Sequence, residues 1–296
     1  MITISNHNLK ITLHTPDSAK GYYRGTRFDW AGVFERIEYR GCNYSEPWFE
    51  SYSPTMHDAV CGPAEEFSPI GLEGAKAGDP FLKIGVGILE RIDDEQYDRF
   101  RLHNILEEGE RIMEKGDDHV RFIHRIASET GYGYEYVKEI ALTSGSGFAI
   151  RHILKNTGAK ELQGDIYNHN FFTLGLLQTG PGRQMDFPFK PEGDWRASYD
   201  EVGFTESGIR FTRELHKGES VYTGNLHETG KGLTGSPDAF SLYETSTGRG
   251  IRMSCDILMT KTVFWANHRI ACLEPYIDFE IKPGESFAFD IDYTLI

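Results

Sequence analysis

Apolar and polar residues alternate with a period of two over much of this sequence. In the clearest run, every second residue from Phe287 to Leu295 is large and apolar. Residues 132–140 and 147–156 alternate in a similar way, and the glycine- and serine-rich residues 144–147 between them predict the turn of a β-hairpin. Such alternation is typical of half-buried strands.

Glycine-rich turns separate these runs, and helical periodicity is scarce. The best helical candidate, residues 99–115, is rich in charge and has no continuous apolar stripe. Residues 168–172 are predicted to form a strand. Residues 277–281, the turn at 282–285 and the last strand are predicted to form a C-terminal hairpin. Many short strands with glycine turns favour an all-β sandwich, and we expect residues 1–296 to form a single domain.

Composition limits the partners of the chain. Its 296 residues carry a formal net charge of −14, which argues against nucleic acid or an anionic membrane as a partner, because both require a basic surface. No apolar run approaches the length of roughly 20 residues that spans a bilayer. No signal peptide is apparent and the four cysteines form no CxxC pair, so a cytoplasmic protein with reduced thiols is expected.

Two short segments carry candidate chemistry. His169 lies in residues 167–172, Tyr-Asn-His-Asn-Phe-Phe, and Glu274 lies in residues 272–276, Cys-Leu-Glu-Pro-Tyr. The amides of Asn168 and Asn170 could bind hydroxyl groups, and aromatic rings could stack on the apolar face of a sugar. A histidine and a carboxylate can transfer protons. Taken alone, each also has a structural interpretation, as a core histidine and as a solvated surface carboxylate.

These segments, together with the Lys-Pro-Gly-Glu turn at 282–285, resemble motifs of the galactose mutarotase (aldose 1-epimerase) family. The resemblance implies a β-supersandwich whose concave sheet binds a small-molecule carbohydrate. It also implies that His169 is the general acid on the ring oxygen and Glu274 the general base on the anomeric hydroxyl. No metal or cofactor is required by this chemistry, and the spacing of His103, His119 and His124 matches no metal-ligand pattern.

The N-terminal half departs from the better-known galactose mutarotases, since no arginine-containing segment followed by a His-Gly pair is found. His57 is the candidate for a second binding-site histidine, although its neighbour Asp58 would face the other side of a strand. Arg24 and Arg27 are candidates for clamping a hydroxyl or acidic group, and Trp265 could stack on a sugar or lie in the core.

Three other functions stay open at this point. The first is a sugar-binding or sensing protein without catalysis. The second is an epimerase of a sugar phosphate or uronate, held by Arg24, Arg27 or Lys83. The third is a glycoside hydrolase or lyase, which would need a second carboxylate; Asp186, Asp256 and Asp278 are candidates that the sequence does not rank. The oligomeric state is not predicted.

Overall fold

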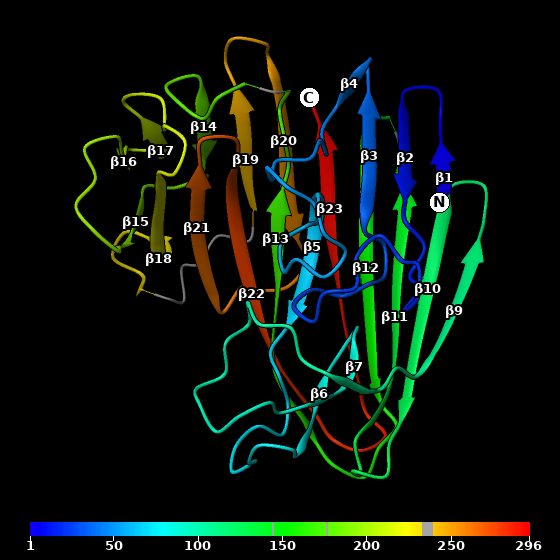
Figure 1. The fold of residues 1–296 in the computed structure, drawn as a ribbon. Helices are drawn as coiled ribbons and strands as arrows, with labels where there is room; N and C mark the ends of the chain where they lie inside the picture. Colours follow the sequence, from blue (N-terminus) through cyan, green and yellow to red (C-terminus); the bar gives the residue numbers. More distant parts are fainter. Residues whose placement is uncertain (144, 176, 233–238) are drawn as a thin grey trace.

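Two large antiparallel sheets dominate the structure (Figure 1). The computed structural model describes residues 1–143, 145–175, 177–232 and 239–296. These residues form 23 strands and no α-helix, which confirms the prediction of an all-β fold. That residues 1–296 form a single domain stays a prediction.

The larger sheet has ten strands. Their order is β16 (Val202–Phe204), β17 (Gly208–Phe211), β14 (Arg183–Asp186), β19 (Ala239–Glu244), β20 (Arg249–Cys255), β23 (Ser286–Leu295), β12 (Gly147–Asn156), β11 (Gly133–Leu142), β10 (His119–Ala127) and β9 (Glu110–Lys115). The second sheet has six strands. Their order is β15 (Pro191–Trp195), β18 (Ser220–Glu228), β21 (Lys261–Asn267), β22 (Ala271–Ile281), β13 (Leu162–Phe171) and β5 (Gly62–Phe67).

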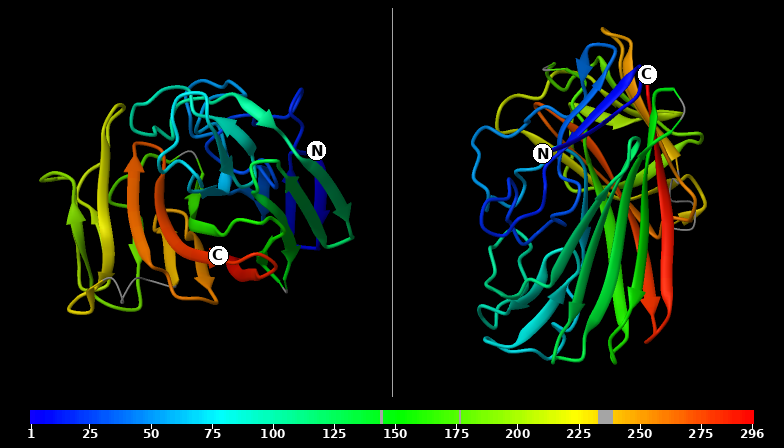
Figure 2. Two further views of the ribbon diagram at one scale, coloured as in Figure 1. Left: turned by 90° about the horizontal axis from the view of Figure 1, so that it is seen from below. Right: turned by 90° about the vertical axis from the view of Figure 1, so that its right-hand side faces the viewer.

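Two smaller sheets come from the first third of the chain. One contains β1 (Ile2–Ser5), β2 (Leu9–Leu13), β3 (Phe34–Tyr39) and β4 (Cys42–Asn43), and the other contains β6 (Pro80–Lys83), β7 (Gly87–Glu90) and β8 (Ile105–Glu107). In the right-hand view of Figure 2, these blue and cyan segments lie along one side of the long green and red strands. The N-terminal third therefore covers one side of the sandwich.

The predicted strands are found, but one predicted pairing is wrong. Strands β11 and β12 pair antiparallel as expected, although Ser144 of their turn lies outside the described residues. The C-terminal hairpin does not form, because β22 pairs with β13 and β21, whereas β23 pairs with β12 and β20. The turn at 282–285 thus carries the chain from one large sheet to the other. Periodicity reveals a strand but not the sheet to which it belongs.

The two faces of the six-stranded sheet belong to different apolar clusters. Ile166, Leu273 and Ile277 pack into the main core together with residues of the ten-stranded sheet. Tyr167 and Tyr276, one residue away along the same strands, pack instead into a second cluster that includes the N-terminal segments. Since successive side chains point to opposite faces of a strand, β13 and β22 serve the core with one set and the second cluster with the other.

Strand β5 brings two adjacent carboxylates into the interior. Glu65 and Glu66 are 1% and 2% exposed and contact different partners. Glu65 meets Lys138 of β11 and accepts a hydrogen bond from Asn168 at 2.9 Å. Glu66 lies on the other face with Arg27 and other cations. Buried carboxylates require such partners, because an unpaired buried charge is very costly.

Lys138 allows a stability prediction. Its ammonium group donates to Glu65 and to the carbonyl of Ala31, and it lies 3.5 Å from Asp29. We expect Lys138→Met to lower the free energy of unfolding by about 3–5 kcal/mol, because two buried carboxylates lose their cation. Urea unfolding measures this. The exposed Lys155 of β12 is the matched control, and Lys155→Met should change stability by less than about 0.5 kcal/mol. Equal effects of the two substitutions would contradict the prediction.

Candidate active site

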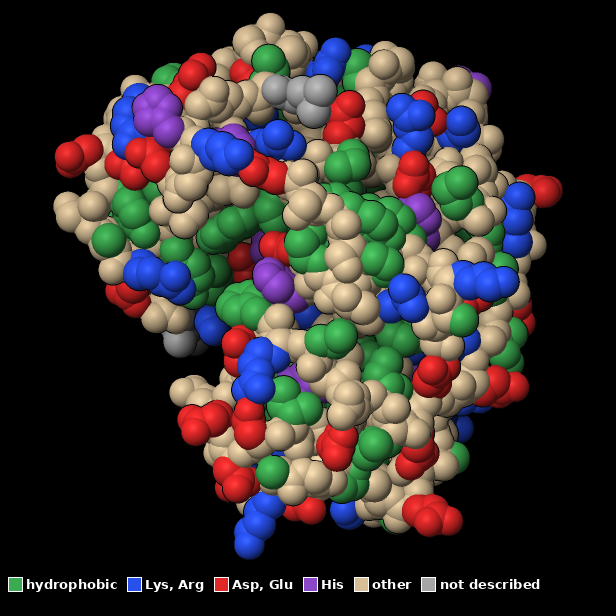
Figure 3. All heavy atoms as spheres, in the orientation of Figure 1, with side chains coloured by type: hydrophobic (Ala, Val, Ile, Leu, Met, Phe, Trp, Pro, Cys, Tyr) green, Lys and Arg blue, Asp and Glu red, His purple; other side chains and the backbone are tan. Residues whose placement is uncertain are grey.

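A cavity of about 510 Å³ lies on the face of the six-stranded sheet that the N-terminal segments cover. Figure 3 shows it as a hollow with histidine and carboxylate side chains inside, apolar groups around them and basic side chains nearby. The residues that line it are Arg27, Trp48, His57, Asp58, Arg99, Phe100, His169, Phe171, Arg196, Tyr222, Lys261, Trp265, Glu274 and Tyr276.

Strand register places His169 and Glu274 side by side on the floor of this cavity. Tyr167 of β13 pairs with Tyr276 of β22, so two residues further along β13 and two residues back along β22 bring His169 opposite Glu274. The neighbouring strands contribute small residues to this row. Ala64 of β5 pairs with His169, and Val263 of β21 pairs with Glu274.

The two candidate proton-transfer groups are in contact. Nε2 of His169 lies 3.3 Å from Oε1 of Glu274, and the two residues are 4% and 7% exposed. Burial raises the pKa of Glu274 to about 7, partly opposed by Arg27 and Arg99. Burial, helped by the same two arginines, holds the pKa of His169 well below its ordinary value. Both groups therefore favour their neutral forms, so the proton that the pair carries below about pH 7 resides on Glu274.

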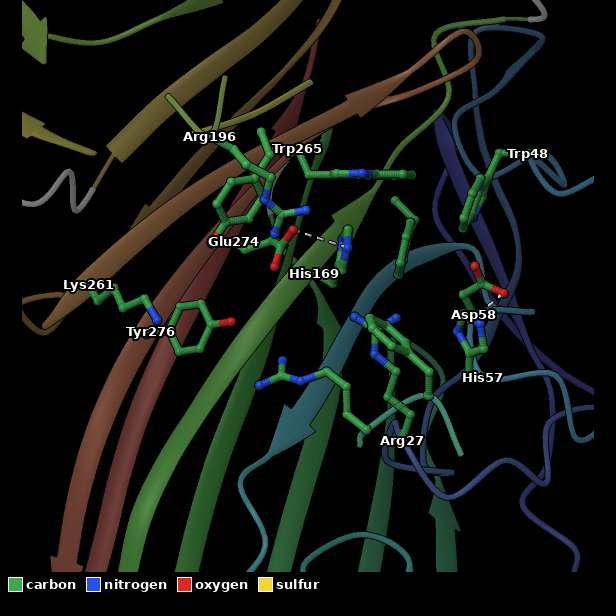
Figure 4. A pocket seen from close by; sticks show the side chains of 14 residues that line it. Arg27, Trp48, His57, Asp58, His169, Arg196, Lys261, Trp265, Glu274 and Tyr276 are labelled. Carbon is green, nitrogen blue, oxygen red and sulfur yellow. Dashed lines mark ion pairs between the residues drawn. The ribbon is translucent and has the colours of Figure 1, made fainter. Parts of the chain in front are cut away.

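Aromatic rings form one side of the cavity. Phe171 stacks on the imidazole of His169 with the ring centroids 3.6 Å apart, and Trp48 stacks on Phe171 at 5.0 Å. Trp265 meets His169 edge-on at 5.8 Å. In Figure 4 the imidazole of His169 lies between Trp48 and Glu274, with Trp265 next to it. The rings hold the imidazole in place and provide an apolar wall suited to a sugar face.

Cationic side chains form another part of the wall. Arg27 is held rigidly, since it donates to Glu66 and to the hydroxyl of Tyr167, both at 2.8 Å. Arg99 donates to the same hydroxyl at 3.2 Å. Arg196 lies over the ring of Tyr222, and Lys261 lies over the ring of Tyr276.

His57 and Asp58 both reach the cavity. They lie in a turn rather than in a strand, so neighbouring residues need not point in opposite directions. Nδ1 of His57 is 3.6 Å from Oδ1 of Asp58. Burial lowers the pKa of His57, although Asp58 opposes the shift.

Asn168 and Asn170 lie away from the cavity, contrary to the sequence expectation. The hydroxyl of Tyr293 in β23 is 3.0 Å and 2.8 Å from their side-chain oxygens, and Asn170 donates to the carbonyl of Leu273 at 2.8 Å. Because His169 faces the cavity, its immediate neighbours must face the core. Both amides therefore join the two large sheets.

Lys83 and Arg24 are also absent from the cavity wall. Lys83 is fully buried and donates to Glu66 at 3.2 Å and to the carbonyl of Phe67. Its ammonium group therefore bonds to groups inside the protein and not to a ligand in the cavity. Arg24 lines a separate hollow with Tyr22 and Tyr52. Of the residues proposed from sequence, the cavity brings together His169, Glu274, His57, Arg27 and Trp265.

Several cavity residues were not found from the sequence. Phe171 and Tyr276 are two positions from His169 and Glu274, and Lys261 is four positions from Trp265, so the strand period could have indicated them. Trp48, Arg99 and Arg196 lie outside the strands. No local sequence pattern indicates that residues in such irregular segments reach a cavity formed by strands far away in the sequence.

Comparison with solved structures identifies the architecture. No protein-family model matches the sequence, and no curated protein matches it. A galactose mutarotase-like protein from Lactobacillus casei superposes with a TM-score of 0.58 at 13% identity, covering 100% of both chains. One from Clostridium acetobutylicum gives 0.60 at 12% identity, covering 99% of this chain and 94% of the other. An aldose epimerase homologue from C. elegans gives 0.56 at 14% identity, covering 100% and 98%.

The chain has the galactose mutarotase-like fold. The resemblance noted in the sequence is therefore confirmed for the architecture, and the mutarotase-like fold extends over the N-terminal half, where the motifs depart. Low identity means that the comparisons concern this fold and not the residues of the cavity.

Two further observations concern the described part of the chain. Within it, no group of three or more His, Cys, Asp or Glu side chains is arranged to hold a metal ion. Nor does the described chain contain any helix with the length and hydrophobicity needed to cross a membrane.

The raised pKa of Glu274 predicts a pH-dependent cost to stability. A carboxyl whose pKa is about 7 when folded, against an ordinary 4.5, stabilises the fold below pH 4.5 and loses that contribution as the pH rises toward 7. Relative to wild type, Glu274→Gln should therefore gain up to about 3 kcal/mol in unfolding free energy between pH 5 and pH 8. Urea unfolding at the two values measures it. The exposed Glu280 of the same strand provides the control Glu280→Gln, and a difference independent of pH at Glu274 would contradict the assignment.

Proposed function

We propose that this protein interconverts the anomers of an aldose-type sugar, with His169 as general acid and Glu274 as general base. The observation that supports it is the contact between these two residues on the floor of a cavity with an aromatic wall. In a cyclic sugar the ring oxygen and the anomeric hydroxyl are bonded to the same carbon. Two proton-transfer groups from adjacent strands can therefore reach both oxygens of one bound molecule.

The proposed reaction opens the sugar ring and closes it again. Glu274 takes the proton of the anomeric hydroxyl, and the electron pair left on that oxygen forms the carbonyl bond. The bond between the anomeric carbon and the ring oxygen breaks, and the ring oxygen takes a proton from Nε2 of His169. Rotation about the bond from the carbonyl carbon to its carbon neighbour then exposes the other face. Reclosure returns each proton to its donor, so the chain's own residues complete the cycle.

Substitution of either residue tests this proposal. Glu274→Gln and His169→Asn should each slow anomer exchange by about 10²–10⁴-fold, since each removes one positioned proton-transfer group. Exchange spectroscopy by NMR on a panel of aldoses and anionic aldose derivatives measures the rate. Glu280→Gln should match wild type. Acceleration by wild type that persists in Glu274→Gln would overturn the assigned base. Saturable sugar binding without acceleration would instead indicate a sugar-binding protein.

The pH profile provides an independent test. The active pair must carry one proton, placed on His169 for acid catalysis while Glu274 is ionised. Because that last proton leaves with a pKa of about 7, kcat/KM should fall as the pH rises through 7. It should also fall in acid, where a second proton adds to the pair. A profile that rises through pH 7 and stays high to pH 9 would show that the pair works without that proton.

A further inference from the structure

The cavity is basic, although the protein as a whole is acidic. The net charge of the chain is −14, yet four cationic side chains and only two carboxylates line this cavity. One of those carboxylates, Glu274, is half-protonated near neutral pH. A local excess of positive charge on an acidic protein marks a place where an anion is attracted from solution.

Two of the four cations, Arg196 and Lys261, form no ion pair within 4 Å among the described residues, although Lys261 lies near enough to Asp165 and Glu274 to lower their pKa values. Arg27 and Arg99 both lie within 3.5 Å of Glu66. Within the described parts of the chain, Arg196 and Lys261 form no ion pair with a carboxylate, and the ring contacts with Tyr222 and Tyr276 are their side-chain interactions. A ring face engages a cation from one side only and leaves its remaining N–H donors available.

These donors belong to side chains that line the same cavity as the proton-transfer pair. In Figure 4, Arg196 extends toward Glu274, and Lys261 lies beyond the ring of Tyr276, on the side of the pair away from Trp48. Arg99 has a 39% exposed side chain that also lines the cavity. The cavity is therefore polarised, with Phe171 and Trp48 on one side of His169 and positive charge that no ion pair neutralises on the other.

We propose that Arg196 and Lys261, assisted by Arg99, bind an anionic substituent, a phosphate or a carboxylate, of the sugar whose anomeric carbon lies at His169 and Glu274. The proposal rests on the proposed function only for the position of the anomeric carbon. Arginine and lysine are the usual partners of such groups, since they supply charge and several donors. A neutral sugar would leave Arg196 without a counter-charge and Lys261 with only the longer-range attraction of Asp165 and Glu274.

The residues assigned to the anion here differ from Arg24, Arg27 and Lys83, which the sequence suggested. Arg24 lines a different hollow and Lys83 is occupied by Glu66 and the carbonyl of Phe67. Arg27 contributes charge, but its guanidinium is already fixed by Glu66 and Tyr167. Arg196 and Lys261 are exposed, so their substitution should leave the fold intact.

Binding to matched ligands tests the proposal. The probes are glucose, glucose 6-phosphate, glucuronate and inorganic phosphate, titrated by NMR against wild type, Arg196→Met, Lys261→Met and the double variant. We expect an anionic sugar to bind at least about tenfold more tightly than glucose, and each substitution to reduce this preference by about threefold to tenfold. Added salt should weaken the preference. The affinity for glucose 6-phosphate, compared with that for glucuronate, shows whether the site prefers a phosphate or a carboxylate.

Two exposed cations far from the cavity provide control substitutions for the binding experiment. Lys155→Met and Arg252→Met change exposed cations of the ten-stranded sheet and should retain the full preference. Equal affinity for glucose and both anionic sugars, or a preference unchanged in the double variant, would overturn the inference. Inorganic phosphate binding that depends on Arg196 and Lys261, without anomer exchange, would support it while removing the proposed function. Rapid exchange of glucose, insensitive to phosphate, would do the reverse.

Discussion

The buried carboxylate of Glu66 is the interaction on which the cavity depends. It meets Arg27 at 2.8 Å, Lys83 at 3.2 Å and Arg99 at 3.5 Å, and it accepts a hydrogen bond from Tyr167. Burial alone would raise its pKa, but the three cations lower the pKa to about 2. The network ties three separate N-terminal segments to the six-stranded sheet. Without it, the segments that cover the cavity face would lose their charged anchor.

The adjacent glutamate performs the same task on the other face of β5. Glu65 contacts Lys138 in the ten-stranded sheet and Asn168 in β13, while the hydroxyl of Tyr293 joins the amides of β13 to β23. Polar groups therefore cross the core between the two large sheets, directly behind the row that holds His169. Hydrogen bonds of this kind have strict directions, so they fix the position of β13 along its neighbouring strands in a way that apolar packing alone does not.

The same burial that stabilises these networks sets the chemistry of the cavity. Glu66 is kept ionised by three cations in direct ion pairs, whereas Glu274, only 7% exposed, has a raised pKa because burial outweighs the attraction of Arg27, Arg99 and Lys261, none of which forms an ion pair with it among the described residues. Two carboxylates on one sheet face thus acquire different protonation states from different surroundings. One serves as an anchor, and the other is poised to exchange a proton near neutral pH.

The period-two pattern and the glycine turns determined the all-β class and most strands. The residues around His169 and Glu274 singled out these two side chains as candidates for proton transfer. All of these are local properties of the sequence. Tertiary structure alone decided which side chains meet. Strands β13 and β22 are buried on both faces, so hydrophobicity could not tell that His169 faces the cavity while Asn168 and Asn170 face the core. The pairing of β22 and β23 with different sheets, and the arrival of Arg99 and Arg196 from irregular segments, depend on contacts between residues far apart in the chain. Such contacts leave no periodic pattern in the sequence from which they could be predicted.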